Sequence, residues 1–111
     1  MAAKAPPSTI AQVKDVFTKL GEISDQVVFG DVWERKQLSK RDRSLITIAA
    51  LTALYRTEEL RGHIGRALDN GVTTTEIGEM ITHMALYAGW PCGVNAGRVA
   101  KQVFDERGLS Y

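Results

Sequence analysis

The sequence predicts an all-α protein. Apolar residues recur at helical spacing, helix start and stop signals separate the segments, and no segment alternates between apolar and polar residues as a strand does. A chain of 111 residues with 44% hydrophobic residues fits one domain with a small core, residues 1–111. Residues 1–7, which contain two prolines, are expected to form a flexible lead-in. We therefore predict a single-domain bundle of about six helices.

The first third of the chain is expected to contain two of these helices. Apolar residues at helical spacing predict a helix over residues 10–20, which Gly21 would end. A shorter helix is expected over residues 22–29. Residues 31–38 would then form a connector that places Trp33 against the core.

An almost wholly apolar helix is expected next. Ser39 is a good N-cap, and residues 40–56 contain neither Gly nor Pro. The run Leu45–Tyr55 is apolar around the whole helix, which predicts burial on all sides. So short a chain can hardly bury this surface alone, and we expect an obligate oligomer in which another subunit covers part of it. The run has roughly half of the ~20 residues that a membrane-spanning helix needs, so no membrane association is expected.

Three further helices complete the predicted bundle. Thr57 is expected to cap the first of them, and a capping box of Thr73 and Glu76 opens the second. Pro91 is allowed in the first turn of the last helix, which Gly108 would close. Small residues on this last helix form a stripe where another helix can approach closely. The stripe consists of Gly93, Ala96, Gly97 and Ala100.

The composition excludes several classes of function. Lys and Arg number 14 against 13 Asp and Glu, so no basic excess is present to attract nucleic acid. The first ten residues lack an apolar stretch of signal-peptide length, which makes a cytoplasmic location the expectation. Cys92 is the only cysteine, which excludes an internal disulfide and any Cys-x-x-Cys redox or zinc motif.

Two Glu–His pairs are the main candidates for chemistry. Glu59 and His63 are four residues apart, which places them on one face of a helix, and Glu79 and His83 repeat this spacing on the next helix. If both pairs faced one cavity, the site would contain two carboxylates and two imidazoles near a cation. The candidate cations are Arg43, Arg56 and Arg61.

Three interpretations of these pairs are open. Metal binding is the weakest, because carboxylate-type metal sites in helical bundles use Glu-x-x-His and further glutamates, so no metal is expected. General acid/base catalysis is the second, in which a carboxylate orients the imidazole and brings its pKa near neutral pH. The third is structural, since such a pair on an exposed helix face contributes only about 0.2–0.5 kcal/mol.

Five other residues have both a functional and a structural interpretation. His83 has mostly apolar neighbours in the sequence and can be a core residue. Cys92 lies near the start of the last helix, where the helix dipole can lower a thiol pKa, but small buried cysteines are commoner. Trp33 and Trp90 fit core or interface positions better than substrate stacking, and Tyr87 fits either role.

Several stretches resemble the carboxymuconolactone decarboxylase family. They are FGDVWERKQLS from Phe29, RSLITIAALTAL from Arg43, and EELRGHIGRALDNGVTTTEIGEMITHMALYAGWP from Glu58, and the match extends to Gly108. This resemblance implies an all-helical subunit of the alkylhydroperoxidase D-like type that assembles into trimers or hexamers. It also implies a site near the contacts between subunits.

The peroxidase branch of this superfamily differs from the present sequence at the matching helix. That branch has Cys-x-x-Cys-x-x-x-His, whereas this chain has Arg56 and Glu59 at the two cysteine positions and retains the histidine as His63. The branch's upstream proton-relay glutamate would align near Ser44. The resemblance therefore implies a member without the dithiol. An antioxidant protein that uses Cys92, or a non-catalytic oligomer that binds small molecules, is the alternative.

The family's named activity implies a carboxy-lyase of aromatic compound catabolism, in the β-ketoadipate pathway, that needs no cofactor. The substrate would be 4-carboxymuconolactone or a related small carboxylated lactone, so a cation must bind a carboxylate and an acid must deliver a proton. The match implies that His63 transfers the proton, that Glu59 orients the imidazole of His63, and that Arg43 or Arg56 binds the carboxylate. The expected pocket-lining residues are His83, Tyr87 and Trp90.

Overall fold

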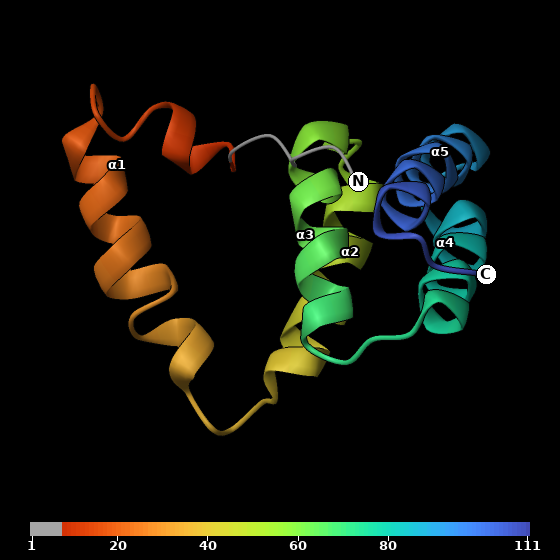
Figure 1. Cartoon of the computed structure of the whole chain (residues 1–111), viewed down its shortest axis with the longest axis horizontal. Coiled ribbons are helices and arrows are strands. Elements are labelled where there is room, and N and C mark those ends of the chain that lie inside the picture. Colours follow the sequence, from red (N-terminus) through yellow and green to blue (C-terminus); the bar gives the residue numbers. More distant parts are fainter. Residues whose placement is uncertain (1–7) are drawn as a thin grey trace.

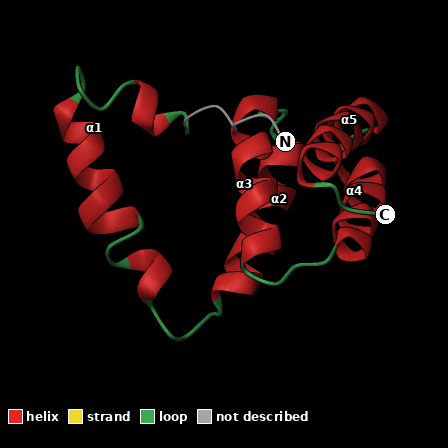
Figure 2. Cartoon of the chain, in the orientation of Figure 1, coloured by secondary structure: helices red, strands yellow, loops and turns green. Residues whose placement is uncertain are grey.

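All regular secondary structure in the described part of the chain is helical. The computed structural model describes residues 8–111, so the lead-in predicted for residues 1–7 lies outside the described residues. Within that range the structure contains five α-helices, three short 3₁₀ or π segments and no strand (Figure 2). The α-helices are α1 (Thr18–Ile23), α2 (Lys40–Ala53), α3 (Thr57–Asp69), α4 (Thr74–Ala88) and α5 (Trp90–Arg107). The predicted all-α class is confirmed.

The N-terminal segment differs from the predicted helix over residues 10–20. A 3₁₀ segment, η1 (Ile10–Gln12), is followed by turns, and α1 begins only after them. Gly21 lies inside α1 and does not end it. A Cβ at this position would lie 2.9 Å from the Cβ of Lys14, so glycine allows two turns of the chain to approach closely. Because α1 continues directly into a π-helical turn, η2 (Ser24–Val28), the described chain has five α-helices rather than about six.

Residues 8–38 form an N-terminal arm in which α1 lies apart from the other helices (Figure 1), while Ser8, Thr9 and Gln12 line a second pocket together with residues of α3 and α5. Its last segment, η3 (Val32–Glu34), contacts α2 where the arm joins the bundle. Six apolar residues of the arm are each between 41% and 70% exposed. They are Val16, Phe17, Leu20, Ile23, Val27 and Val32. Several large exposed apolar side chains on one segment are typical of an interaction surface.

Helices α2 to α5 form a bundle with one buried apolar cluster. Helix α2 packs against α3, α4 and α5, and α5 also packs against α3 and α4. The cluster consists of Ile48, Leu60, Ile64, Ala67, Val72, Ile77, Met80, Ala96, Val99, Ala100, Val103 and Phe104. No helix within residues 8–111 has the length and apolar character needed to cross a bilayer.

The apolar run in α2 is buried on only one face within this chain, in line with the expectation that so short a chain can hardly bury all of it alone. Ile48 is fully buried, whereas Ile46 is 58% exposed and Leu54, just after the helix, is 62% exposed. One face of α2 packs against the other helices of the bundle, and the opposite face has no such cover. The uncovered face therefore remains available for contacts with another molecule.

Local signals account for most of the helix ends. The Ser39 hydroxyl caps α2, a capping box that includes Thr73 opens α4, and Gly108 closes α5 with a left-handed φ of 66°. Helix α3 differs from the prediction, because Arg56 occupies its N-cap position and Thr57 is its first residue. No side chain caps that end.

The stripe of small residues on α5 allows a close approach of α4. A Cβ on Gly93 would lie only 2.4 Å from the Cβ of Ala85, whereas a Cβ on Gly97 would meet no atom within 4 Å. The two glycines of this stripe therefore differ in function, since only Gly93 is required by the packing of α4 on α5.

Candidate functional site

The candidate site lies where the arm meets α3. Glu59, His63 and Arg66 follow one another at helical spacing along α3, so they share a face of that helix. Phe29 and Trp33 approach this face from the arm, and their rings lie 5.8 Å apart. The site therefore combines residues from two segments that are about thirty positions apart in the sequence.

His63 is half-buried, and its ring stacks on Trp33. The two ring centroids are 6.2 Å apart and the rings are tilted by 27°. Nδ1 of His63 is buried and has no hydrogen-bond partner among the described residues. Burial lowers the pKa of His63, the positive charge of Arg66 lowers it further, and the negative charge of Glu59 acts in the opposite direction. The imidazole is therefore held in its neutral form at pH 7.

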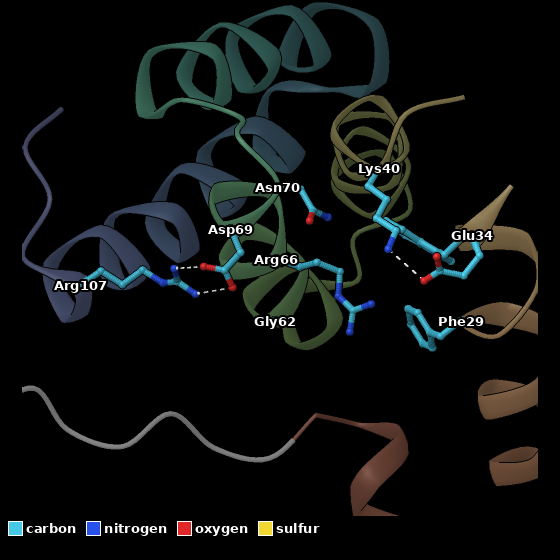
Figure 3. A pocket seen from close by; sticks show the side chains of 9 residues that line it. Phe29, Glu34, Lys40, Gly62, Arg66, Asp69, Asn70 and Arg107 are labelled. Atoms are coloured by element: carbon cyan, nitrogen blue, oxygen red, sulfur yellow. Dashed lines mark hydrogen bonds and ion pairs between the residues drawn. The ribbon is translucent and has the colours of Figure 1, made fainter. Parts of the chain in front are cut away.

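Arg66 projects from α3 toward Phe29 of the arm (Figure 3). Its guanidinium carbon lies 4.2 Å from the centroid of the Phe29 ring and 5.6 Å from that of Trp33. Both separations are within the range of a cation–π interaction. Arg66 and His63 thus contact the same indole ring.

A pocket of about 590 Å³ opens beside Trp33 and Arg66, and neither His63 nor Glu59 is among the residues that line it. It is lined by Phe29, Trp33, Glu34, Lys40, Gly62, Arg66, Asp69, Asn70 and Arg107 (Figure 3). Two ion pairs lie in this lining: Lys40 Nζ is 2.9 Å from Glu34, and Arg107 Nη1 is 2.7 Å from Asp69. Three cations thus face two carboxylates, which leaves a net charge of +1 and favours an anionic ligand.

Arg43 lies on α2 and is half-buried. One of its terminal nitrogens, Nη2, donates to the carbonyl oxygen of Arg35 at 3.3 Å. Its Nε is buried and has no hydrogen-bond partner among the described residues. Arg43 therefore keeps an unused donor, although it does not line the pocket beside Arg66.

The other predicted site residues lie elsewhere on the surface. Arg56 is exposed at the start of α3. His83 and Tyr87 stack on each other on the exposed side of α4, with ring centroids 4.7 Å apart. Tyr87 is 78% exposed, and Trp90, at the start of α5, is 70% exposed. None of these four residues lines the pocket beside His63 and Arg66.

The second Glu–His pair and the remaining candidates do not join the first pair in a metal-binding group. Glu79 is exposed on α4, and Arg61 forms an ion pair with Glu106 of α5. Within residues 8–111, no group of three or more His, Cys, Asp or Glu side chains is arranged to bind a metal ion. Cys92 is half-buried, and its Sγ lies 3.9 Å from the carbonyl oxygen of Ala53.

The comparison with known families decides the class of protein. The model of the carboxymuconolactone decarboxylase family matches residues 19–102. This chain belongs to the carboxymuconolactone decarboxylase family. Family membership confirms the resemblance found in the sequence.

Three relatives show how this family member compares with curated proteins. It is 45% identical over 82 residues to 4-carboxymuconolactone decarboxylase of Acinetobacter baylyi, which covers 74% of this chain and 61% of that protein. It is 34% identical over 91 residues to nitrosuccinic acid decarboxylase of Metarhizium robertsii, and this match covers 81% of this chain and 64% of that protein. An uncharacterized 15.0 kDa protein of Paracoccus denitrificans is 35% identical over 80 residues, and this match covers 70% of this chain and 60% of that protein. The matched part of the chain thus spans between 60% and 64% of the length of these relatives.

None of the nine residues that line this family member's pocket was among the predicted site residues, and three of them show why. Arg66 was not among the candidates, although its position three residues after His63 places both on one helix face. Trp33 was interpreted as a core or interface residue, and the structure shows it in contact with both of them. No sequence signal indicated Phe29, because its approach to α3 depends on how the arm folds back.

Proposed function

We propose that this family member is a carboxy-lyase that uses no cofactor and removes carbon dioxide from a small carboxylated lactone. The substrate would be 4-carboxymuconolactone or a related compound of aromatic catabolism. The main supporting observation is the half-buried His63 ring, which has a partnerless Nδ1 and stacks on Trp33, a lining residue of a pocket with net positive charge. The decarboxylase names of two relatives support the same class of reaction.

The proposed reaction needs one proton for each turnover. The C–C bond to the departing carboxylate breaks, carbon dioxide leaves, and the electron pair shifts through the ring alkene to a carbon that accepts a proton. His63 is the proposed donor of that proton. Its pKa is lowered in the free protein, and a bound anion favours the imidazolium form, so substrate binding itself promotes protonation of the donor.

The other predicted residues differ in how they relate to this proposal. Glu59 favours the protonated form of the ring, since its charge acts to raise the pKa of His63. The proposed role of Glu59 in orienting the ring would require a hydrogen bond that the described residues do not show between these two side chains. Arg43 has an unpartnered Nε, but this atom is buried and Arg43 does not line the pocket, so the predicted carboxylate-binding role of Arg43 is not part of this proposal. Arg56, His83, Tyr87 and Trp90 line the substrate path only if another subunit brings these exposed residues to a pocket, as a site near subunit contacts would require.

Self-association to a trimer or hexamer is part of the same proposal. The exposed apolar side chains of the arm and the uncovered face of α2 supply the surfaces that would be buried. Replacement of Phe17 and Leu20 by serine should dissociate the assembly, as measured by light scattering after size-exclusion chromatography. Lys19→Ser, on the polar side of the same helix, is the matched control and should keep the native mass. Equal masses for wild type and the double variant would contradict this part of the proposal.

The proposed function is tested by an assay of the purified wild-type chain. Carbon dioxide release and loss of the carboxylated lactone are measured with 4-carboxymuconolactone, then with related carboxylated lactones. The proposal predicts stoichiometric release of carbon dioxide without any added cofactor. If neither 4-carboxymuconolactone nor the related lactones are turned over, the carboxy-lyase assignment is wrong.

A further inference from the structure

Arg66 differs from the other cations of the pocket because it has no carboxylate partner among residues 8–111. Lys40 is paired with Glu34, and Arg107 is paired with Asp69. The Arg66 guanidinium instead lies against the rings of Phe29 and Trp33. An arginine positioned by aromatic rings keeps its N–H donors, which match a carboxylate in a bidentate arrangement. Its charge is therefore fixed in place and not neutralised.

The space beside Arg66 is open enough to admit a ligand. Gly62 lies one helical turn before Arg66 and lines the same pocket. A Cβ at Gly62 would meet no atom within 4 Å, so no side chain fills this part of the pocket. A small anion can thus reach the guanidinium along the surface of α3.

The chemistry of decarboxylation decides which carboxylate this cation should bind. A carboxylate that leaves as carbon dioxide loses its charge in the reaction, so an ion pair to it stabilises the substrate more than the transition state. A carboxylate that stays on the product keeps its charge throughout. A fixed arginine therefore assists the reaction when it binds the retained carboxylate and leaves the departing one unpaired.

We propose that Arg66 is the residue that binds the retained carboxylate of a dicarboxylate lactone, with Phe29 and Trp33 as positioning residues. This inference rests on the proposed function, and it adds a specificity residue to it. Because Trp33 contacts both Arg66 and His63, the same indole sets the position of the bound anion relative to the proton donor. A lactone with no retained carboxylate should bind poorly.

The inference is tested by binding and not by turnover. The probe is muconolactone, which has a retained carboxylate and lacks the departing one, so it cannot lose carbon dioxide. Its methyl ester is the neutral control ligand. Affinities for both are measured by calorimetry with wild type, Arg66→Gln, Arg66→Lys and the control Arg98→Gln. Arg98 is exposed on α5 and lies outside this pocket.

We expect wild type and Arg98→Gln to bind the acid on the order of 10- to 100-fold more tightly than the ester, as for other hydrogen bonds between charged groups. Arg66→Gln should bind both ligands equally, at the level of the wild type with the ester. Arg66→Lys should retain part of the preference, because it keeps the charge and loses the planar fork. Thermal unfolding of each variant verifies that it is folded.

Two results would overturn the inference. One is a wild type that does not prefer the acid to the ester, and the other is an Arg66→Gln variant that keeps the full preference. Failure of the carboxy-lyase assignment is distinguishable from both. In that case carbon dioxide release is absent, while a preference for the acid that depends on Arg66 still appears in the binding experiment.

Discussion

Trp33→Ala is the most informative single change in the site, because the indole contacts both His63 and Arg66. The substitution removes a stacked ring pair with a centroid separation of 6.2 Å and a cation–π contact of 5.6 Å. It also removes the aromatic neighbour of Phe29. Both the attachment of the arm to α3 and the environment of His63 should therefore change.

The magnitude of the effect follows from these contacts. An aromatic pair contributes about 0.5–1.5 kcal/mol, and a partly exposed cation–π contact contributes about 0.5–1 kcal/mol. We therefore expect Trp33→Ala to lower the free energy of unfolding by about 2 kcal/mol. Urea unfolding monitored by circular dichroism, at a fixed protein concentration, measures this loss.

The same variant should raise the pKa of His63 toward its usual value, because burial is the main cause of its lowering. An NMR titration of the imidazole resonances measures this change. Tyr111→Ala is the control, and it should leave the titration of His63 unchanged because Tyr111 packs against Phe104 and does not line the pocket. A Trp33→Ala variant that loses less than about 0.5 kcal/mol and keeps the titration of His63 would refute this reasoning.

Three further changes test other parts of the molecule. The folded state disfavours the charged form of His63, so the pKa of this histidine is lower in the folded than in the unfolded chain. As pH falls through the usual pKa of 6.5, the unfolded state binds more protons, and the free energy of unfolding should therefore decrease. His63→Gln should reduce that pH dependence in urea unfolding between pH 7 and pH 5, and an unchanged dependence would contradict the cause given for the shift. Gly93→Ala should cost about 1–3 kcal/mol, because its Cβ would lie 2.4 Å from that of Ala85, while the control Gly97→Ala should be neutral or slightly stabilising. Cys92→Ser should keep the rate of carbon dioxide release within about twofold of wild type. Complete loss of a peroxide-linked activity in this variant would instead favour the antioxidant alternative.

The helical class and most helix ends could be predicted because they depend on local chemistry. Ser39, Thr73 and Gly108 each act on backbone groups within a few residues, so the sequence alone contains the relevant information. The end assigned to Gly21 was wrong because that glycine serves a contact with Lys14, seven residues earlier. Spacing alone does not distinguish a glycine at a helix end from a glycine at a close contact.

The site could be predicted only in part for a similar reason. His63 was found through the motif that it shares with the family, and its place on α3 agrees with that motif. The contacts of Phe29 and Trp33 with α3 depend on the path of the arm, which no local pattern specifies. Arg66 was therefore indistinguishable in the sequence from an ordinary exposed cation on a helix.

The apolar surface of α2 shows a different limit. The sequence indicated an apolar circumference correctly, but burial of that circumference requires neighbours on every side. Within one chain, Ile46 and Leu54 lack such neighbours. Their exposure in the structure agrees with the expectation that one subunit cannot cover this surface alone.

The most direct test of the proposed mechanism is the rate of carbon dioxide release by His63→Ala. Loss of a general acid should lower kcat by about two to four orders of magnitude. Circular dichroism and light scattering should show that this variant keeps the helical content and the mass of wild type. A folded His63→Ala variant whose kcat stays within about twofold of wild type would contradict proton transfer by His63.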